Sequence, residues 1–209
     1  MERPVRIVGI GGSVASTSKS LSALQAAVAG AREAGARTEL FDLHRLNLPV
    51  FNPELIGSPP ETALEWAEGA LAADGLLWCS PMYHGTISGA FKNALDWLYL
   101  LRDHEPPYLA DKVIGLISTA GGTQGLQAVN TMEFIVRSLR AWAVPLVIPV
   151  GPANSLFDSR GNLEDNAARQ QLEVLGSEVV RVARLFAAGK LADAEAECAE
   201  AARRVGLAA

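Results

Sequence analysis

Short apolar runs alternate along the chain with longer stretches in which apolar residues recur every three or four positions. The short runs are rich in branched residues, and most end at glycine, serine or proline, which is typical of buried strands. They predict strands at Val5–Ile10, Thr38–Leu43, Gly75–Cys79, Lys112–Thr119 and Pro145–Val150. The longer stretches predict helices at Ser20–Ala34, Glu61–Ala73, Ile87–Leu101, Gly125–Trp142 and Leu163–Ala188. Residues 44–59 are rich in proline, glycine and asparagine and are predicted to form a loop.

The order of these elements predicts the fold class. Strand and helix alternate, which favours an α/β protein with a parallel sheet and helices on both faces. Right-handed crossovers leave few arrangements, and a five-stranded sheet favours the order 2-1-3-4-5 of a flavodoxin-like three-layer sandwich. We assign this domain to residues 1–188 and a C-terminal helical tail to residues 189–209. Within the tail, residues 191–205 are rich in alanine and are expected to form a short additional helix.

Composition narrows the class of protein further. The 209 residues are 49% hydrophobic and 20% charged, which excludes a disordered chain. A net charge of -5 disfavours a general nucleic-acid binder. The cysteines, Cys79 and Cys198, are too few for a disulfide framework or a four-cysteine metal site, and Cys79 is expected to be a small buried residue. No apolar run reaches 18 residues, so we expect a protein that does not bind a membrane. We also expect a cytoplasmic protein that binds neither nucleic acid nor metal.

Three segments are expected to meet at one edge of the sheet. In an open parallel sheet of this order, ligands bind beyond the carboxyl ends of the strands, between the first and third strands of the chain. The first segment, residues 11–20, follows the first strand; the second, residues 80–89, follows the third; and the third, residues 118–125, follows the fourth. All three are rich in glycine or hydroxyl side chains, so we expect the ligand site where they meet.

The first segment has the composition of a phosphate site. Its glycines allow close backbone approach, and its hydroxyls stand at the amino end of a helix, where the dipole favours an anion. Neither the dinucleotide pattern G-x-G-x-x-G nor the Walker pattern is present, so a single phosphate monoester fits better than a pyrophosphate. The structural alternative is a serine-rich cap and turn. The candidate phosphate ligands are Ser13, Ser16, Thr17, Ser18 and Ser20.

The other two segments fit a planar heteroaromatic ligand. The second places the rings of Tyr83 and His84 beside the expected cleft, with little formal charge. The third has three glycines in its last five residues, and their uncovered N–H groups could stabilise negative charge on the ligand's edge. The alternatives are a half-buried surface ring at Tyr83, a hydrogen-bonded loop residue without a chemical role at His84, and a glycine turn without a ligand.

Together the segments resemble the NADPH-dependent FMN reductase family. The family motif G-S-x-R-x-x-S-x-N matches Gly12–Ser20, and P-x-Y-N/H-G-S-x-x-G-x-x-K-N-A-x-D-W matches Pro81–Trp97 nearly position for position. The resemblance spans about residues 5–150. Ala15 replaces the basic residue of the family motif, and Ser20 replaces its last asparagine. Lys19 could restore the lost charge from a neighbouring position.

The resemblance implies non-covalent FMN, with NADPH or NADH as the electron donor. Serines of the first segment would hold the phosphate, the second segment would line the ribityl chain and ring, and the third would border the pyrimidine edge. No catalytic side chain is expected, because the flavin carries the chemistry. The implied cofactor-binding residues are Ser13, Ser16, Thr17, Ser18, Ser20, Pro81, Met82, Tyr83, His84, Gly85, Ser118, Ala120, Gly121, Gly122 and Thr123.

The function implied is that of an NAD(P)H-dependent FMN reductase. A hydride would pass from nicotinamide to FMN, and electrons would move on to a second acceptor, such as free flavin for a monooxygenase or a quinone. The alternative is a non-enzymatic, flavodoxin-like FMN-binding electron-transfer protein. Such carriers usually dock through a strongly acidic face, and a net charge of -5 is mild, which favours the enzyme.

Two further features bear on partners. The predicted helix 87–101 is apolar on more than one side, which predicts a homodimer or tetramer formed through it. The polar segment 102–107 could reach over the cleft, or over a partner subunit, and contact the nucleotide; alternatively, it forms a solvated loop.

Overall fold

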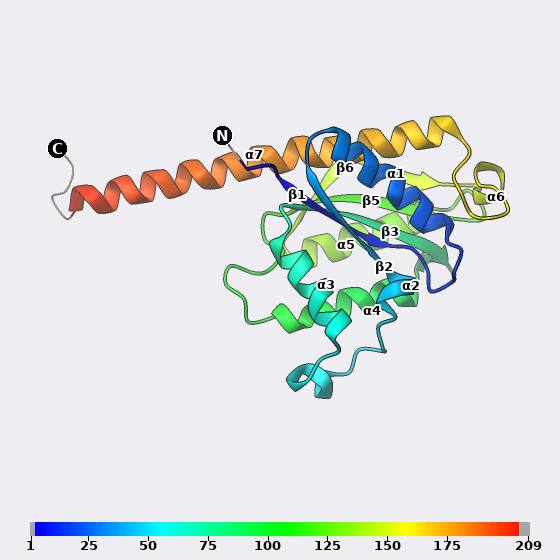
Figure 1. Ribbon diagram of the computed structural model, residues 1–209, viewed down its shortest axis with the longest axis horizontal. Helices are drawn as coiled ribbons and strands as arrows, with labels where there is room; N and C mark the ends of the chain where they lie inside the picture. Colours follow the sequence, from blue (N-terminus) through cyan, green and yellow to red (C-terminus); the bar gives the residue numbers. More distant parts are fainter. Residues whose placement is uncertain (1–2, 205–209) are drawn as a thin grey trace.

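A parallel sheet forms the centre of the molecule (Figure 1). The computed structural model describes the backbone of residues 3–204 and the side chains of residues 3–189. The main strands lie in the order β2-β1-β3-β5-β6, which is the predicted order 2-1-3-4-5. Their bounds are Arg6–Gly11 for β1, Arg37–Asp42 for β2, Gly75–Tyr83 for β3, Val113–Thr119 for β5 and Trp142–Val150 for β6. A sixth strand, β4 (Thr86–Ile87), pairs antiparallel with the end of β3.

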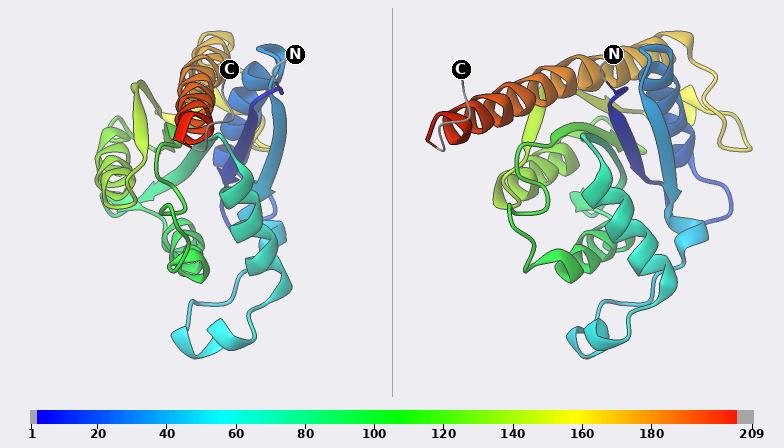
Figure 2. Two further views of the ribbon diagram at one scale, coloured as in Figure 1. Left: turned by 90° about the vertical axis from the view of Figure 1, so that its left-hand side faces the viewer. Right: turned by 60° about the vertical axis from the view of Figure 1, so that its left-hand side comes forward.

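Helices cover both faces of this sheet, as predicted (Figures 1 and 2). Neighbouring strand residues point to opposite faces: Ile7 and Leu77 belong to one buried cluster, and Val8 and Leu76 belong to the other. The first cluster is completed by α1 (Lys19–Glu33) and α7 (Asn166–Arg204), and the second by α3 (Glu61–Ala72), α4 (Gly89–Trp97) and α5 (Leu126–Ser138). The shorter helices are α2 (Leu43–Leu46), α6 (Ala153–Leu156), η1 (Pro53–Gly57) and η2 (Leu98–Leu101).

The two helices of the first layer touch backbone to backbone. A Cβ built on Gly30 of α1 would lie 2.1 Å from the carbonyl oxygen of Glu173, and one built on Gly176 of α7 would lie 1.9 Å from that of Ala27. Real Cβ atoms do not approach this closely, so glycine is required at both positions. This crossing fixes the helix that follows the first segment against the helix that ends the chain.

The predicted helix 125–142 ends earlier than expected. Arg140 adopts a left-handed conformation, with φ 63°, and the N–H groups of Arg140 and Ala141 bond back to the carbonyls of Arg137 and Val136. These two bonds form a Schellman motif, which ends α5 and lets β6 begin at Trp142. Glycine usually occupies the left-handed position. An arginine there explains why no stop signal was visible in the sequence.

The C-terminal helix is longer than predicted. α7 runs without interruption from Asn166 to Arg204, so the expected separate helix at 191–205 is wrong over the described residues, and residue 205 lies outside them. The last turns of α7 extend past the amino ends of the strands, beyond the rest of the described chain (Figures 1 and 2). No helix in the described part of the chain is long and apolar enough to cross a membrane.

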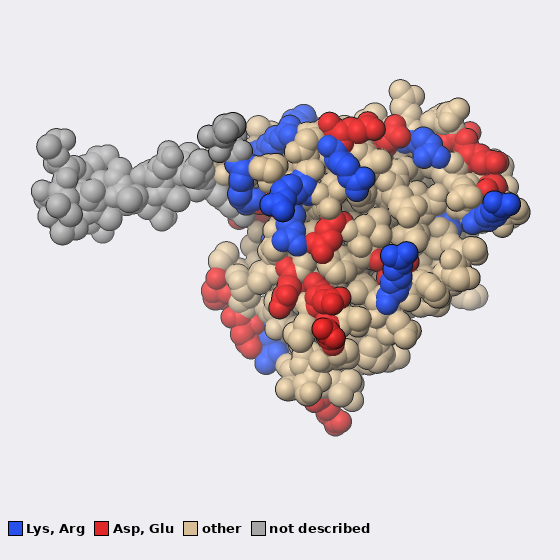
Figure 3. Space-filling model, in the orientation of Figure 1, with Lys and Arg blue, Asp and Glu red and all other residues tan. Residues whose placement is uncertain are grey.

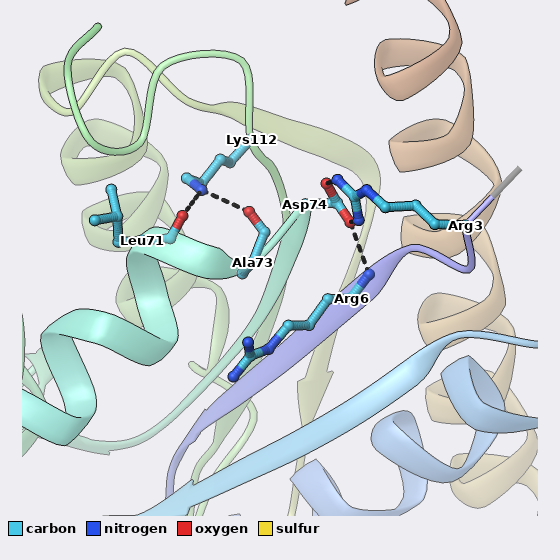
Figure 4. Close-up of polar contacts among 6 residues, drawn as sticks. All are labelled: Arg3, Arg6, Leu71, Ala73, Asp74 and Lys112. Carbon is cyan, nitrogen blue, oxygen red and sulfur yellow. Dashed lines mark hydrogen bonds and ion pairs between the residues drawn. The ribbon is translucent and has the colours of Figure 1, made fainter. Parts of the chain in front are cut away.

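The amino edge of the sheet is held by polar contacts (Figure 4). Asp74 accepts two hydrogen bonds of 2.7 Å from the guanidinium of Arg3 and one of 2.8 Å from the N–H of Arg6. The ammonium of Lys112 donates to the carbonyls of Leu71 and Ala73, at the carboxyl end of α3. Segment 102–107 also lies at this edge, because it joins η2 to the start of β5. The expectation that it could reach over the cleft of its own chain is therefore wrong, and contact with a partner subunit stays a prediction.

The outer side of α4 is covered by the chain's own loop. The indole N–H of Trp97 and the amide of Asn93 both donate to the carbonyl of Pro49, at 2.9 Å each. The ring of Phe51 packs edge-on against Trp97 and Tyr99. This loop therefore buries much of the apolar surface from which a partner subunit was predicted, while Tyr99 remains 48% exposed.

Candidate functional site

A cavity of about 300 Å³ lies at the carboxyl edge of the sheet. This edge of the sheet is on the right-hand side of Figure 1. We call it the carboxyl-edge cavity. It is formed by the three predicted segments together with a fourth, residues 151–163, which follows β6. Its lining residues are Ser13, Ala15, Thr17, Ser18, Lys19, Ser20, Pro81, Met82, Tyr83, Thr119, Ala120, Gly121, Ala153, Asn154, Ser159 and Gly161.

The first segment turns out of β1 at a glycine and ends at the start of α1. Gly12 has φ +96°, a conformation that side chains rarely adopt, and Ser18 caps the helix by accepting a hydrogen bond from the N–H of Leu21. The middle of the segment is held from outside, because the ring of His44 bonds to the carbonyl of Val14 at 2.8 Å. The first residues of α1, Lys19 and Ser20, line the carboxyl-edge cavity. The first N–H groups of a helix have no partner within the helix, which suits an anion site.

The inner end of the first segment is joined to the third. The hydroxyls of Ser20 and Thr119 lie 2.5 Å apart, and both residues are buried. The thiol of Cys79 donates to the carbonyl of Ser20 at 3.1 Å. Burial raises the pKa of the Cys79 thiol, so it stays protonated and acts as a small packing group. Cys198 lies outside the described side chains.

The second segment is a tight hairpin rather than an open loop. β3 continues to Tyr83, and β4 returns from Thr86. His84 and Gly85 form the two-residue turn, with φ 49° and φ 82°. Positive φ at both positions is typical of a type I′ turn, and histidine tolerates this conformation better than most residues. The hairpin leaves the Tyr83 ring 56% exposed beside the carboxyl-edge cavity.

The third segment is shaped by a buried serine and kept open by glycines. Ser118 is fully buried, and its hydroxyl donates to the carbonyl of Gly125 at 2.7 Å, which closes the loop. A Cβ built on Gly121 or Gly122 would meet no atom within 4 Å. This side of the cavity therefore has room for a flat ligand against the backbone.

Most of the sequence-predicted site residues come together. Lining the cavity are Ser13, Thr17, Ser18, Ser20, Pro81, Met82, Tyr83, Ala120 and Gly121. Ser16, His84, Gly85, Ser118, Gly122 and Thr123 do not line it, although they belong to the same segments. In the described part of the chain, no cluster of histidine, cysteine, aspartate and glutamate could hold a metal ion.

The fourth segment contributes residues that the sequence analysis missed. Ala153, Asn154, Ser159 and Gly161 all line the carboxyl-edge cavity. The prediction was confined to the segments around the switch point of the sheet. A signal was nevertheless present, because this segment also follows a parallel strand and is rich in glycine, serine and asparagine.

The turn inside the fourth segment is organised by Asp158. Its carboxylate accepts hydrogen bonds of 2.8 Å from the N–H groups of Arg160 and Asn162 and from the side-chain amide of Asn162. These bonds, with those from Asn162 contributing most, lower the pKa of Asp158. The turn holds Ser159 and Gly161 beside the start of α1.

A larger hollow, of about 560 Å³, lies near the amino end of β6. Arg137, Arg140, Asp111 and Glu133 line it, so its formal charges cancel, and the three predicted segments contribute nothing to it. Ligands of parallel α/β sheets bind beyond the carboxyl ends of the strands. We therefore assign function to the smaller carboxyl-edge cavity.

Comparisons with known proteins identify the family of the chain. Residues 5–154 match the family model described as NADPH-dependent FMN reductase. The chain is 32% identical to an NAD(P)H-dependent FMN reductase of Pseudomonas aeruginosa, over 84% of this chain and 95% of that protein. It is 30% identical to an NADPH:quinone oxidoreductase of Arabidopsis thaliana, over 81% of this chain and 87% of that protein.

Solved structures share the fold. The NAD(P)H:(acceptor) oxidoreductase FerB of Paracoccus denitrificans aligns with a TM-score of 0.68 at 20% identity, over 87% of this chain and 98% of that one. A WrbA-like flavodoxin from Agrobacterium tumefaciens aligns with a TM-score of 0.61 at 19% identity, over 87% of this chain and 98% of that one. At these identities the likeness establishes the flavodoxin-like fold alone.

Proposed function

Because this chain belongs to the NADPH-dependent FMN reductase family, we propose that its carboxyl-edge cavity is the FMN site. The protein is an NAD(P)H-dependent flavin oxidoreductase that uses FMN. The proposal extends this to individual residues: the first segment holds the phosphate, the second lies along the ribityl chain and ring, and the third borders the pyrimidine edge.

The residues present fit this cofactor. At one end of the cavity, hydroxyls and the amino end of α1 supply hydrogen-bond donors for a phosphate. At the other, Gly121 lines the cavity and Gly122 follows it, with open space where a side chain would stand. This open backbone is the observation that carries the proposal, because a flat ring can reach the N–H groups only where no side chain intervenes.

When bound, FMN supplies the redox chemistry, taking a hydride from reduced nicotinamide and passing electrons to a second acceptor. The chain's own part is to bind and orient. The N–H groups of the third segment stabilise negative charge at the edge of the ring. The exposed Tyr83 ring flanks the cavity mouth, where nicotinamide and the acceptor must both approach. No side chain is assigned as a general base.

The acceptor we propose is a small planar oxidant, either a quinone or free flavin, which in turn could serve a monooxygenase. Relatives named for a quinone and for azo compounds support an acceptor of this chemical class. On the face that Figure 3 shows, Lys and Arg gather in the upper part, and Asp and Glu predominate in the lower part. The net charge of -5 is mild for a carrier that docks through a strongly acidic face, which favours the enzyme over the carrier.

The test is anaerobic mixing of the purified protein and FMN with NADPH or NADH in separate cuvettes. We expect loss of the visible flavin absorbance with at least one nucleotide, and the ratio of rates gives the preference. Binding of FMN without bleaching by either nucleotide would contradict the reductase and leave the electron carrier. Adding a quinone or excess FMN to the reduced protein then identifies the acceptor.

We also propose that the protein forms a homodimer or tetramer through the region of α4 and η2. The support is exposed apolar surface in that region, namely Tyr99 of η2 at 48% exposure and Val50 of the loop before η1 at 84%. Tyr99 contacts Phe51, the neighbour of Val50 in the chain, so the two exposed side chains belong to one region of the surface.

A further inference from the structure

The structure places a single lysine at the phosphate end of the carboxyl-edge cavity. We propose that the Lys19 ammonium, positioned by Asn154, pairs with the phosphate of the cofactor and makes the site selective for FMN over riboflavin. This inference rests on the proposed function of the cavity as an FMN site. It assigns a charge partner to the phosphate, together with a positioning residue from the fourth segment.

Lys19 stands where a helix ordinarily disfavours a cation. It is the first residue of α1, and the first turn of that helix contains no acidic residue. The amino end of a helix carries partial positive charge, so a lysine there is unfavourable unless an anion lies nearby. Departures from such local rules concentrate at functional sites. An anion between the Lys19 ammonium and the free N–H groups of α1 would interact favourably with both groups and would make a lysine at this position favourable.

The side chain is directed along the cavity by an uncharged partner. Lys19 Nζ donates to Asn154 Oδ1 at 2.8 Å, and both residues line the carboxyl-edge cavity. An ammonium has three donors, so this bond leaves two for a ligand. Because the partner is an amide rather than a carboxylate, the positive charge of Lys19 is not cancelled by this contact.

The fourth segment, which carries Asn154, is held from both sides of the cavity. The N–H of Ala153 donates to the carbonyl of Ala120, in the third segment, at 2.9 Å. Gly161 lies directly against the backbone of the first segment, since a Cβ built on it would be 3.6 Å from the nitrogen of Lys19. The N–H of Leu163 bonds to the hydroxyl of Ser22 on α1 at 3.0 Å. The fourth segment therefore bridges the first and third segments and sets where Lys19 can point.

This arrangement also accounts for Ala15. The family motif has a basic residue at that position, and Ala15 lines the same cavity here. The side chain of Lys19 can bring a positive charge to the same space from four residues further along. An ammonium and a phosphate form a charge-assisted hydrogen bond, which neutral riboflavin cannot make.

The test compares FMN with riboflavin. Dissociation constants for both are measured by flavin fluorescence at low ionic strength for the wild type, Lys19→Gln, Lys19→Arg and Asn154→Leu. We expect Lys19→Gln to weaken FMN binding roughly fivefold to tenfold and to leave riboflavin binding unchanged. Lys19→Arg should restore most of the FMN preference, and Asn154→Leu should lose roughly twofold to threefold. Lys92→Gln, an exposed lysine on α4, is the matched control.

The outcomes separate this inference from the proposed function. An unchanged ratio of FMN to riboflavin affinity in Lys19→Gln overturns the inference and leaves the FMN site standing. Equal loss of both ligands also overturns it, because Lys19 would then be structural. Failure of the wild type to bind FMN at all overturns the proposed function, and the inference with it. Thermal unfolding of each variant confirms that it is folded.

Discussion

At Gly122 the polypeptide leaves space that a side chain could fill. A Cβ there meets nothing within 4 Å, so a larger residue should fold normally. Gly122 follows Gly121, which lines the carboxyl-edge cavity, so we expect the larger side chain to interfere with a ligand bound there. We therefore predict that Gly122→Val weakens FMN binding at least roughly tenfold without lowering the melting temperature, because the added branch keeps the ring from the backbone N–H groups. Fluorescence titration measures the affinity. Unchanged binding would show that the pyrimidine edge of FMN does not lie against this loop.

A matched control exists elsewhere in the chain. Gly57, at the end of η1, also has no atom within 4 Å of a built Cβ and lies outside the carboxyl-edge cavity. We expect Gly57→Val to bind FMN as the wild type does. A loss in both variants would point to a general effect of β-branched residues in loops rather than to contact with the flavin.

Asp74 links stability to pH at the amino edge of the sheet. Burial alone would raise the pKa of Asp74, but the hydrogen bonds from Arg3 and Arg6 and the nearby positive charges outweigh it and lower that pKa. A carboxylate with a depressed folded pKa stabilises the protein above its unfolded value, near 3.9, and loses this contribution as pH falls through the folded value.

The corresponding variant is Asp74→Asn. We expect it to be less stable at pH 7 by about 1 kcal/mol, a figure discounted for the partial exposure of the ion pair. The difference from the wild type should shrink as pH falls below about 4, where the wild-type carboxyl becomes protonated. Urea unfolding at several pH values measures this, and a difference that does not change with pH would contradict an electrostatic role.

At the scale of elements, the crossing of α1 and α7 is the tightest contact between helices. We predict that Gly176→Ala lowers the free energy of unfolding by about 3 kcal/mol, since the new methyl group would meet backbone atoms of α1 that cannot move alone. Gly189→Ala on the same helix is the control: its Cβ meets nothing within 4 Å, and alanine favours helix, so stability should hold or rise. Chemical unfolding compares them, and equal effects would rule out the packing explanation.

The observed strands, turns and helix ends also show which parts of the fold could be predicted from the sequence. Short apolar runs predicted every main strand, because burial on both faces of a parallel sheet leaves a strong pattern. The strand order was favoured by the number of strands and by right-handed crossovers rather than by that pattern. Three of the features that escaped prediction have identifiable physical causes. The end of α5 depends on a left-handed Arg140 instead of glycine, the hairpin depends on a turn at His84 and Gly85, and the fourth segment reaches the site only through tertiary contacts. The roles of individual site residues remain predictions.

At the scale of the whole molecule, the proposed dimer or tetramer depends on the surface near Tyr99. We predict a mass of at least two subunits by sedimentation equilibrium at micromolar concentration, because exposed aromatic surface beside a covered helix favours association. Tyr99→Glu should shift the equilibrium toward the single chain by placing charge in the interface. A wild-type mass of one subunit would contradict the proposal. If Tyr99→Glu associates as the wild type does, the interface lies elsewhere on the surface.

The length of α7 affects how such masses can be measured. A helix of 39 residues extends for about 58 Å, whereas a compact chain of 209 residues has a radius of gyration of about 17 Å. A rod attached to a small body increases hydrodynamic friction and slows diffusion. A single chain would therefore elute early from a sizing column and be mistaken for a larger, spherical particle, so light scattering or equilibrium sedimentation must count the subunits.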